Sequence, residues 1–391
     1  MRPLVERMAG FGTTIFAEMS ALAERTGAIN LGQGFPDTDG PPEIVEAAVA
    51  AMRSGHNQYP PGPGIATLRH AIADHQRRRY GLEVDPDREV LVTAGATEAI
   101  AAAVVALAGP GDEVVTFEPY YDSYAATIAM GGATRRTVTL RGADFAFDPD
   151  ELRAAVTPAT RAIVLNTPHN PTGKVFGRAE LAVVAELAQE HDLAVIADEV
   201  YEHLVYDGEH VPIATLPGMA ERTLTISSAG KSFSFTGWKI GWVTGPEALV
   251  AGVRTIKQFL TYVSGAPFQH AVAAALAMGD EVTDELARSL RGKRDRIADG
   301  LTAAGFEVSV PAGTYFICAD VRPVTTALGL PADGLALCRR LPELAGVVAI
   351  PTQVFYDDPA DGSHLVRFAF CKRDDVIDEA CRRLEKMEVP G

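Results

Sequence analysis

The 391-residue sequence has little positive charge and no long apolar run. Its 35 lysine and arginine residues stand against 51 aspartate and glutamate residues, which gives a net charge of −16 at pH 7. Such an acidic surface repels phosphate backbones and anionic lipids, so we expect no nucleic-acid partner and no membrane partner. The longest strictly apolar run, residues 99–108, is far shorter than the roughly 18 residues of a membrane span.

Cysteine is also scarce, and no two cysteines form a CxxC pair. The four lie late in the chain, at Cys318, Cys338, Cys371 and Cys381. This spacing supports neither a zinc site nor a disulfide framework, so we expect no metal and a reducing, cytoplasmic location. Glu6 and Arg7 interrupt the N-terminus before a signal-peptide core could form. The 47% hydrophobic and 22% charged residues are typical of a globular protein.

Short apolar segments alternate with helical segments in the middle of the chain. Strands are expected at 89–93, 113–117, 161–165, 193–197 and 223–226, and helices at 97–108 and 178–191. Near-continuous apolar runs are typical of strands buried on both faces, so we predict an α/β domain with a mostly parallel sheet flanked by helices.

The pattern changes at about residue 246. Long helical stretches at 246–262 and 269–303 precede short strand candidates at 306–310, 315–320 and 365–370, which predicts a smaller α+β domain. We therefore expect three parts: 1–45 as an N-terminal arm that completes part of the small domain, 46–245 as the large domain, and 246–391 as the small C-terminal domain.

Side chains able to do chemistry follow the predicted strands at their carboxyl ends, where open α/β sheets bind ligands. They are an amide, an acid, a phenol and a lysine beside a helix start: Asn170, Asp198, Tyr201, Lys231 and Ala96. Pyridoxal phosphate needs such a set, with an acid for its ring nitrogen and an anion site for its phosphate. Lys231, one of only seven lysines, is a candidate Schiff-base nucleophile because desolvation lowers an ammonium pKa. A lone lysine would more simply be a surface residue.

Several segments, in the same order, resemble the class I aminotransferases, which are pyridoxal-phosphate enzymes of the aspartate aminotransferase fold (fold type I). They are 31–37 (LGQGFPD), 57–60 (NQYP), 166–173 (NTPHNPTG), 198–202 (DEVYE), 228–242 (SAGKSFSFTGWKIGW) and 366–372 (VRFAFCK). Together they span nearly the whole chain and are most similar to the kynurenine, methionine and N-succinyldiaminopimelate branch. The resemblance implies a homodimer that exchanges an amino group between an L-amino acid and a 2-oxo acid by a ping-pong mechanism.

The resemblance also implies roles toward the cofactor ring. Lys231 would bind the cofactor covalently and, once released, move the proton of the substrate Cα. Asp198 would pair with the ring nitrogen, although a lone aspartate at a strand end is often a helix N-cap. Asn170 and Tyr201 would hydrogen-bond the phenolate oxygen, and Asn170 could also form the turn of its Asn-Pro-Thr-Gly segment.

The phosphate and the face of the ring have implied partners as well. The implied partners of the phosphate are the backbone N–H groups of Ala96 and Thr97, the hydroxyl of Ser228, the charge of Lys239, and Tyr59 of a second subunit. Many relatives carry arginine at the position of Lys239. Tyr121 would stack on the ring. Its neighbour Tyr120 is a rival for that role, and core packing is the ordinary alternative for either.

The implied substrate site centres on Arg367, which would bind the α-carboxylate as a fork with help from Gly34 and Asn170. An arginine inside an apolar strand needs an anionic partner. Ile15 and Phe16 would lie near the substrate side chain, which favours an apolar or long side chain.

Within this branch the sequence looks most like bacterial N-succinyldiaminopimelate aminotransferases of amino-acid biosynthesis, with glutamate and 2-oxoglutarate as the second pair. A broad aromatic, kynurenine or methionine aminotransferase and a cysteine-S-conjugate β-lyase remain open alternatives. A ligand-sensing module of a transcription regulator is not expected, because the chain is acidic and has no basic helix-turn-helix extension. A binding protein without activity is disfavoured because Lys231 and Asp198 are both present.

Overall fold

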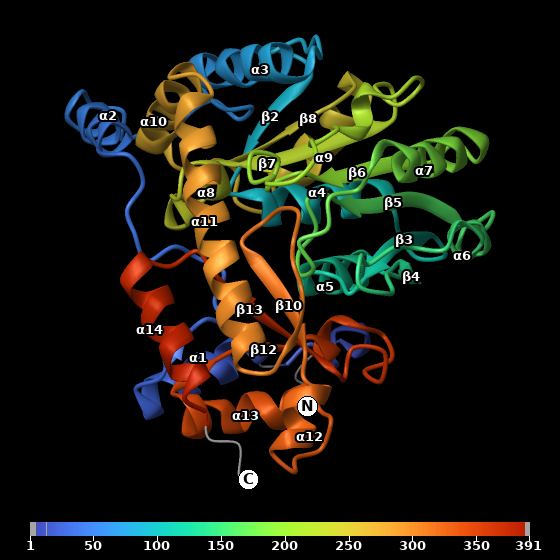
Figure 1. The fold of residues 1–391 in the computed structure, drawn as a ribbon. Helices are drawn as coiled ribbons and strands as arrows, with labels where there is room; N and C mark the ends of the chain where they lie inside the picture. The colour runs from blue at the N-terminus through green and yellow to red at the C-terminus, as the bar shows by residue number, and fades with distance from the viewer. Residues whose placement is uncertain (1–4, 13, 388–391) are drawn as a thin grey trace.

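A seven-stranded sheet forms the larger part of the protein (Figure 1). The structure, a computed structural model, describes residues 5–12 and 14–387; residues 1–4, 13 and 388–391, which include the outer ends of the first and third predicted parts, lie outside the described residues. The strand order is β2-β8-β7-β6-β5-β3-β4. These strands are β2 Val90–Thr93, β3 Glu113–Glu118, β4 Thr134–Thr139, β5 Thr160–Asn166, β6 Ala194–Asp198, β7 Thr223–Ser228 and β8 Gly241–Thr244.

The sheet is mostly parallel, as predicted. Strands β3 to β7 pair in parallel, and β8 is antiparallel to both of its neighbours, β2 and β7. The helices are α1 Ile15–Thr26, α2 Pro42–Arg53, α3 Ala66–Tyr80, α4 Ala96–Leu107, α5 Asp122–Gly131, α6 Pro149–Ala155, α7 Arg178–Glu190, α8 Ala229–Ser232, α9 Glu247–Lys257, α10 Ala266–Ala277, α11 Glu281–Ala303, α12 Arg322–Ala327, α13 Gly334–Ala345 and α14 Asp374–Glu385, with 3-10 turns at Glu6–Met8, Ile213–Thr215, Thr236–Trp238 and Thr352–Phe355.

Helices cover both faces of this sheet, and side chains of the central strands alternate between the two covers. Val114 and Ile196 pack in one core with α4, α5 and α9. Their chain neighbours Val115 and Val195 pack in the opposite core with α6 and α7. Burial on both faces explains why these strands read as continuous apolar runs.

A four-stranded antiparallel sheet, in the order β12-β13-β10-β9, forms the smaller part. Its strands are β9 Glu307–Ser309, β10 Phe316–Asp320, β12 Ile350–Pro351 and β13 Leu365–Ala369. Near the N-terminus, β1 (Ile29–Asn30) pairs in parallel with β11 (Val347–Val348), so this segment packs with the C-terminal part. The long helix α11 extends from beside α10 to β10 (Figure 1). The proposed part boundaries at 45/46 and 245/246 stay predictions.

Two strands of the seven-stranded sheet were not predicted, and one helix that was predicted as continuous is broken. β4 is a half-exposed edge strand containing two arginines, and β8 starts with glycine, so neither forms a long apolar run. The expected helix 269–303 is two helices, α10 and α11, because the chain turns at Gly279, whose φ is +85°.

Within the part of the chain that the structure describes, we find no helix long and apolar enough to cross a membrane.

Candidate active site

A cavity of about 340 Å³ lies at the carboxyl ends of β5, β6 and β7 and is closed from the other side by β13 and the N-terminal segment. Most of the predicted site residues line it: Phe16, Gly34, Ala96, Thr97, Tyr121, Asn170, Asp198, Tyr201, Ser228, Lys231, Lys239 and Arg367. The sheet edge therefore gathers residues from distant parts of the chain, as expected for an open α/β sheet.

Lys231 lies in the short helix α8, which starts directly after β7. Its Nζ donates to the Tyr315 hydroxyl at 2.6 Å and lies 3.4 Å from the Gly34 carbonyl oxygen. Burial lowers the pKa of Lys231 to about 8. A lysine in this state has an appreciable neutral fraction near pH 7 to 8, which a nucleophile and proton acceptor needs.

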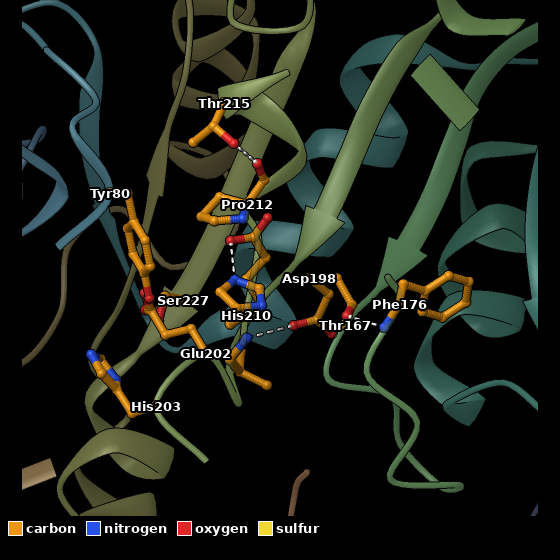
Figure 2. A network of polar contacts seen from close by, with 12 residues as sticks. Tyr80, Thr167, Phe176, Asp198, Glu202, His203, His210, Pro212, Thr215 and Ser227 are labelled. Atoms are coloured by element: carbon orange, nitrogen blue, oxygen red, sulfur yellow. Dashed lines mark hydrogen bonds and ion pairs between the residues drawn. The ribbon is translucent and has the colours of Figure 1, made fainter. Parts of the chain in front are cut away.

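Asp198 is the last residue of β6, and no helix starts there, so it is not a helix N-cap. One carboxylate oxygen accepts from the Tyr124 hydroxyl at 2.5 Å and the other from the Val200 N–H at 3.4 Å. Figure 2 shows Asp198 at the strand end. Burial raises the pKa of Asp198 to about 6. Its hydrogen-bond partners among the described residues are neutral, so a cationic ring nitrogen would complete this site.

Arg367 in β13 is buried with an open hydrogen-bonding fork. Its Nη1 donates to Asn170 Oδ1 at 3.0 Å and its Nη2 to the Gly32 carbonyl at 2.8 Å, while Nε has no partner among the described residues. The guanidinium lies 4.0 Å from the centre of the Phe316 ring. Burial lowers the pKa of Arg367. A buried cation of this kind needs an anion, and a carboxylate fits its planar fork.

The Asn170 side chain hydrogen-bonds outside the turn that contains it. The Asn166 side chain, and not that of Asn170, accepts the hydrogen bond from the Asn170 N–H, at 2.7 Å. The Asn170 oxygen faces Arg367, which leaves its amide nitrogen free to donate toward the cavity.

The start of α4 and the Lys239 side chain make one end of the cavity chemically suited to an anion. The helix begins at Ala96, after Gly95 with φ +78°, and points its first free N–H groups outward. A Cβ on Gly95 would lie 3.3 Å from Lys239 Nζ, and one on Gly241 would lie 2.7 Å from Ala96 N. The bare Gly241 therefore allows β8 to approach the helix start closely. The hydroxyl group of Ser228 lies in the same lining.

The structure distinguishes between Tyr120 and Tyr121. Tyr121 lines the cavity. Tyr120 instead donates to Asp357 at 3.2 Å and lies 4.4 Å from the Arg135 guanidinium, away from the cavity. Of these two neighbours, Tyr121 is therefore the one available to a ring bound in the cavity.

Two predicted residues do not reach the cavity. Ile15 is half-buried against the core of the smaller part, whereas its neighbour Phe16 lines the cavity with its ring 5.2 Å from the Arg367 guanidinium. Tyr59 is 82% exposed and packs edge-on against Tyr262, with 5.5 Å between ring centres.

Sequence reasoning missed Tyr124, Tyr315 and Phe316. Tyr124 follows Tyr121 by three residues, and this helical spacing could have indicated a shared face. Tyr315 and Phe316 come from the other sheet, and only the tertiary packing brings them to the site.

A buried polar network joins α3 to the segments that follow β6 and β7, and Figure 2 shows its members Tyr80, Glu202, His203 and Ser227. Tyr80 donates to Glu202 at 2.6 Å, and Ser227 also donates to Glu202. His75 and His203 meet through their Nε2 atoms at 2.9 Å, and the other ring nitrogen of His203 contacts the Ser232 hydroxyl at 2.9 Å. The network therefore ties α3 to both ends of the segment that contains Ser228 and Lys231.

Three members of this network, His75, Glu202 and His203, also have possible metal-ligand atoms within 4.8 Å of one another. Burial lowers the pKa of both imidazoles, so both are neutral at pH 7. Their mutual hydrogen bond occupies a nitrogen lone pair that a metal would need, and both Glu202 oxygens already accept hydrogen bonds. Our expectation of no metal site stays a prediction.

Comparisons with known proteins agree with this arrangement. The family model for aminotransferase class I and II matches residues 26–384. The chain is 58% identical, over 97% of both chains, to a Mycobacterium tuberculosis protein named probable N-succinyldiaminopimelate aminotransferase DapC. It is 39% identical to the methionine aminotransferase of Escherichia coli, over 98% of this chain and 99% of that one. The solved structure of N-succinyldiaminopimelate aminotransferase from M. tuberculosis has a TM-score of 0.95 and covers 98% of this chain and 100% of its own.

The raised pKa of Asp198 predicts a specific pH dependence of stability without a bound ligand. Between its ordinary value of 3.8 and its folded value of about 6, the folded carboxyl holds its proton more strongly than the unfolded one. Its contribution to the free energy of unfolding therefore decreases as the pH rises. From pH 5.5 to 8, the ligand-free wild type should lose about 1 kcal/mol relative to Asp198→Asn.

Urea unfolding of both proteins across this pH range tests the prediction. Asp192→Asn is the matched control, because it makes the same change at a side chain that is 95% exposed. A difference between wild type and Asp198→Asn that stays constant with pH would contradict the raised pKa.

Proposed function

Since the chain belongs to the class I and II aminotransferases and is a transaminase, we propose that it works with pyridoxal phosphate held by Lys231. The observation that carries the proposal is a buried lysine of lowered pKa beside a buried acid whose hydrogen-bond partners are neutral. Two ionisable groups in these states would be costly to bury without a ligand. When bound, the cofactor supplies an electron sink for the electron pair released at the substrate Cα.

The residues at the two ends of the cavity match the two ends of this cofactor. Asp198 holds the ring nitrogen in its protonated form, while Tyr201 and the free amide nitrogen of Asn170 donate to the phenolate oxygen. The N–H groups at the start of α4, with Ser228 and Lys239, receive the phosphate. Tyr121 packs on the face of the ring.

Arg367 binds the substrate α-carboxylate. Amino acids and 2-oxo acids share this group, so one fork serves both halves of a ping-pong reaction. Asn170 orients the guanidinium through the 3.0 Å hydrogen bond, and the Phe316 ring supports its face. With the carboxylate fixed, the substrate Cα lies within reach of the lysine.

Lys231 moves the proton. Its neutral amine takes the proton from the substrate Cα, and its ammonium form then gives this proton to the carbon of the cofactor, so the lysine ends as a neutral amine again. The pKa of about 8, lowered by burial, leaves both forms accessible near neutral pH.

Chemical trapping tests the role of Lys231. The purified protein should be yellow, and borohydride should fix the cofactor to Lys231, identified by peptide mass spectrometry. Lys231→Ala should lose transamination almost completely, because it removes both the attachment point and the proton carrier. Lys174→Ala is the control, since Lys174 forms an ion pair with Glu180 instead of lining the cavity. Labelling of Lys174 or Lys239 would contradict the assignment.

For the substrate we propose N-succinyldiaminopimelate, with glutamate and 2-oxoglutarate as the second pair. The support is the 58% identity to the M. tuberculosis relative of that name. The cations that line the cavity, within the described residues, are Lys231, Lys239 and Arg367, and each has a role above. No cation of this lining is therefore left to bind a short acidic side chain such as that of aspartate. Phe16 in the lining, close to Arg367, favours a long side chain with apolar methylenes.

A substrate panel tests this narrower proposal. N-succinyldiaminopimelate should give a higher kcat/KM than kynurenine, methionine or phenylalanine, all with 2-oxoglutarate. Phe16→Ala should lower that value several-fold, while Ile15→Ala, one position along the same helix, should change it little. If an aromatic or sulfur amino acid is better by tenfold, about 1.4 kcal/mol in transition-state binding, the narrower proposal is wrong and a broad aminotransferase remains. Pyruvate release without an oxo acid would indicate a β-lyase.

We also propose that the enzyme is a homodimer whose partner contributes Tyr59. An exposed apolar surface surrounds this residue: Tyr59, Phe259, Leu260 and Tyr262 are 82%, 82%, 55% and 53% exposed. Lys257 holds the two segments together by donating to the carbonyls of Gly62 and Tyr262 at 2.8 and 2.9 Å. A large aromatic surface fixed in this way is typical of an interface.

Sedimentation should therefore give a dimer at micromolar concentration. Tyr59→Phe should weaken cofactor affinity about fivefold, roughly 1 kcal/mol for one hydrogen bond to a charged group. Tyr262→Phe, which removes a hydroxyl from the same surface, should leave affinity unchanged. A fully active monomer would contradict the proposal.

A further inference from the structure

Tyr315 lies between the lysine and the N-terminal segment. It directly precedes β10 and is 2% exposed. Its hydroxyl oxygen is 2.6 Å from Lys231 Nζ and 2.6 Å from the Gly34 carbonyl oxygen. Its ring meets the rings of Tyr201 and Phe316 edge-on, with centres 5.3 and 4.9 Å away. Rings on two sides therefore fix the hydroxyl beside the amine.

The direction of these hydrogen bonds follows from counting protons. The hydroxyl has one hydrogen, and the Gly34 carbonyl can only accept, so that hydrogen points to Gly34. A lone pair of Tyr315 then faces Lys231, and the lysine must donate. Burial also raises the pKa of Tyr315 far above its usual range, so the phenol keeps its proton. Such an acceptor interacts more strongly with an ammonium than with a neutral amine.

We propose that Tyr315 is a positioning residue that receives the Lys231 amine whenever this lysine is not bonded to the cofactor; the inference rests on the proposed function. The Lys231 amine then has two positions, one bonded to the cofactor and one hydrogen-bonded to Tyr315. When it is at Tyr315 and has taken a proton from the substrate Cα, the resulting ammonium stays hydrogen-bonded to the phenol oxygen. It releases the same proton when the transfer is completed, so no other acid or base is required.

Other groups around the amine act on its charge but do not replace this contact. The charged or titratable groups that face it from the surrounding segments are Asp198, Tyr201, Lys239, Arg367 and Cys371, with Lys293 of α11 at the small cavity behind it. Burial raises the pKa of the Cys371 thiol to about 11, so it is neutral. Lys239 and Arg367 disfavour an ammonium at Lys231. The lone pair of Tyr315, in contrast, favours the ammonium form of Lys231.

The cofactor-free protein allows a test that does not depend on activity. Trace acetylation with acetic anhydride between pH 6 and 11, read at the Lys231 peptide by mass spectrometry, gives the pKa of Lys231. Tyr315→Phe removes the acceptor and should lower this pKa by about 1, a tenfold change in the ratio of amine to ammonium. Tyr206→Phe is the matched control, because the Tyr206 hydroxyl lies in the same core but donates to the Thr314 carbonyl. It should leave the pKa of Lys231 unchanged.

A second variant and a kinetic measurement guard against a simple packing effect. Tyr315→Met, which fills much of the space without a hydroxyl, should lower the pKa in the same direction. In the loaded enzyme Tyr315→Phe should lower kcat about tenfold and change the KM of the amino acid less than twofold, because Arg367 is untouched. A wild-type pKa in both variants would overturn the inference. If borohydride instead labels another lysine in the wild type, the proposed function itself fails, and the two failures are thus distinguishable.

Discussion

The constraint on which this site depends is the burial of ionisable groups that, among the described residues, form no direct hydrogen bond with a charged partner. Asp198 and Arg367 are both almost inaccessible, and their hydrogen-bond partners among the described residues are neutral. Burial alone disfavours the charged forms of both groups, so it raises the pKa of Asp198 and lowers the pKa of Arg367. Hydrogen bonds reduce the free-energy cost of burying these charges: Tyr124 donates to Asp198, and Arg367 donates to Asn170 and Gly32. A ligand that has a cation at one end and a carboxylate at the other would remove most of the remaining cost.

The sheet supplies the rigidity that this constraint requires. Asp198 and Ser228 end the neighbouring strands β6 and β7, whose positions are fixed by backbone pairing and by cores on both faces. The segment between Ser227 and Ser232 is anchored at both ends by Glu202 and His203. Lys231 therefore starts from a backbone with little freedom, and the mobility that its chemistry needs is left to its side chain.

Much of the fold and of the site was predictable because strand ends can be read locally. The five predicted strands of the large sheet form within one or two residues of their expected limits. Asp198 ends β6, and Asn170 and Lys231 follow the ends of β5 and β7 by four and three residues. Contacts that depend on tertiary packing were not predictable. Tyr315 is 84 residues from Lys231 and reaches it from another sheet. Ile15 and Phe16 differ because adjacent helical residues point about 100° apart, so only Phe16 faces the cavity.

The N-terminal segment around Gly34 shows how backbone atoms can serve a charged site. Its carbonyls at Gly32, Gly34 and Phe35 accept from Arg367, Tyr315 and Lys372, respectively. Carbonyl dipoles reduce the cost of burying these donors without adding a negative charge that would compete with a substrate carboxylate for Arg367. The arrangement requires a close approach, because a Cβ on Gly34 would lie 2.4 Å from the Phe316 ring. Glycine at this position therefore keeps the segment against the cavity, and the open fork of Arg367 remains free for an incoming acid.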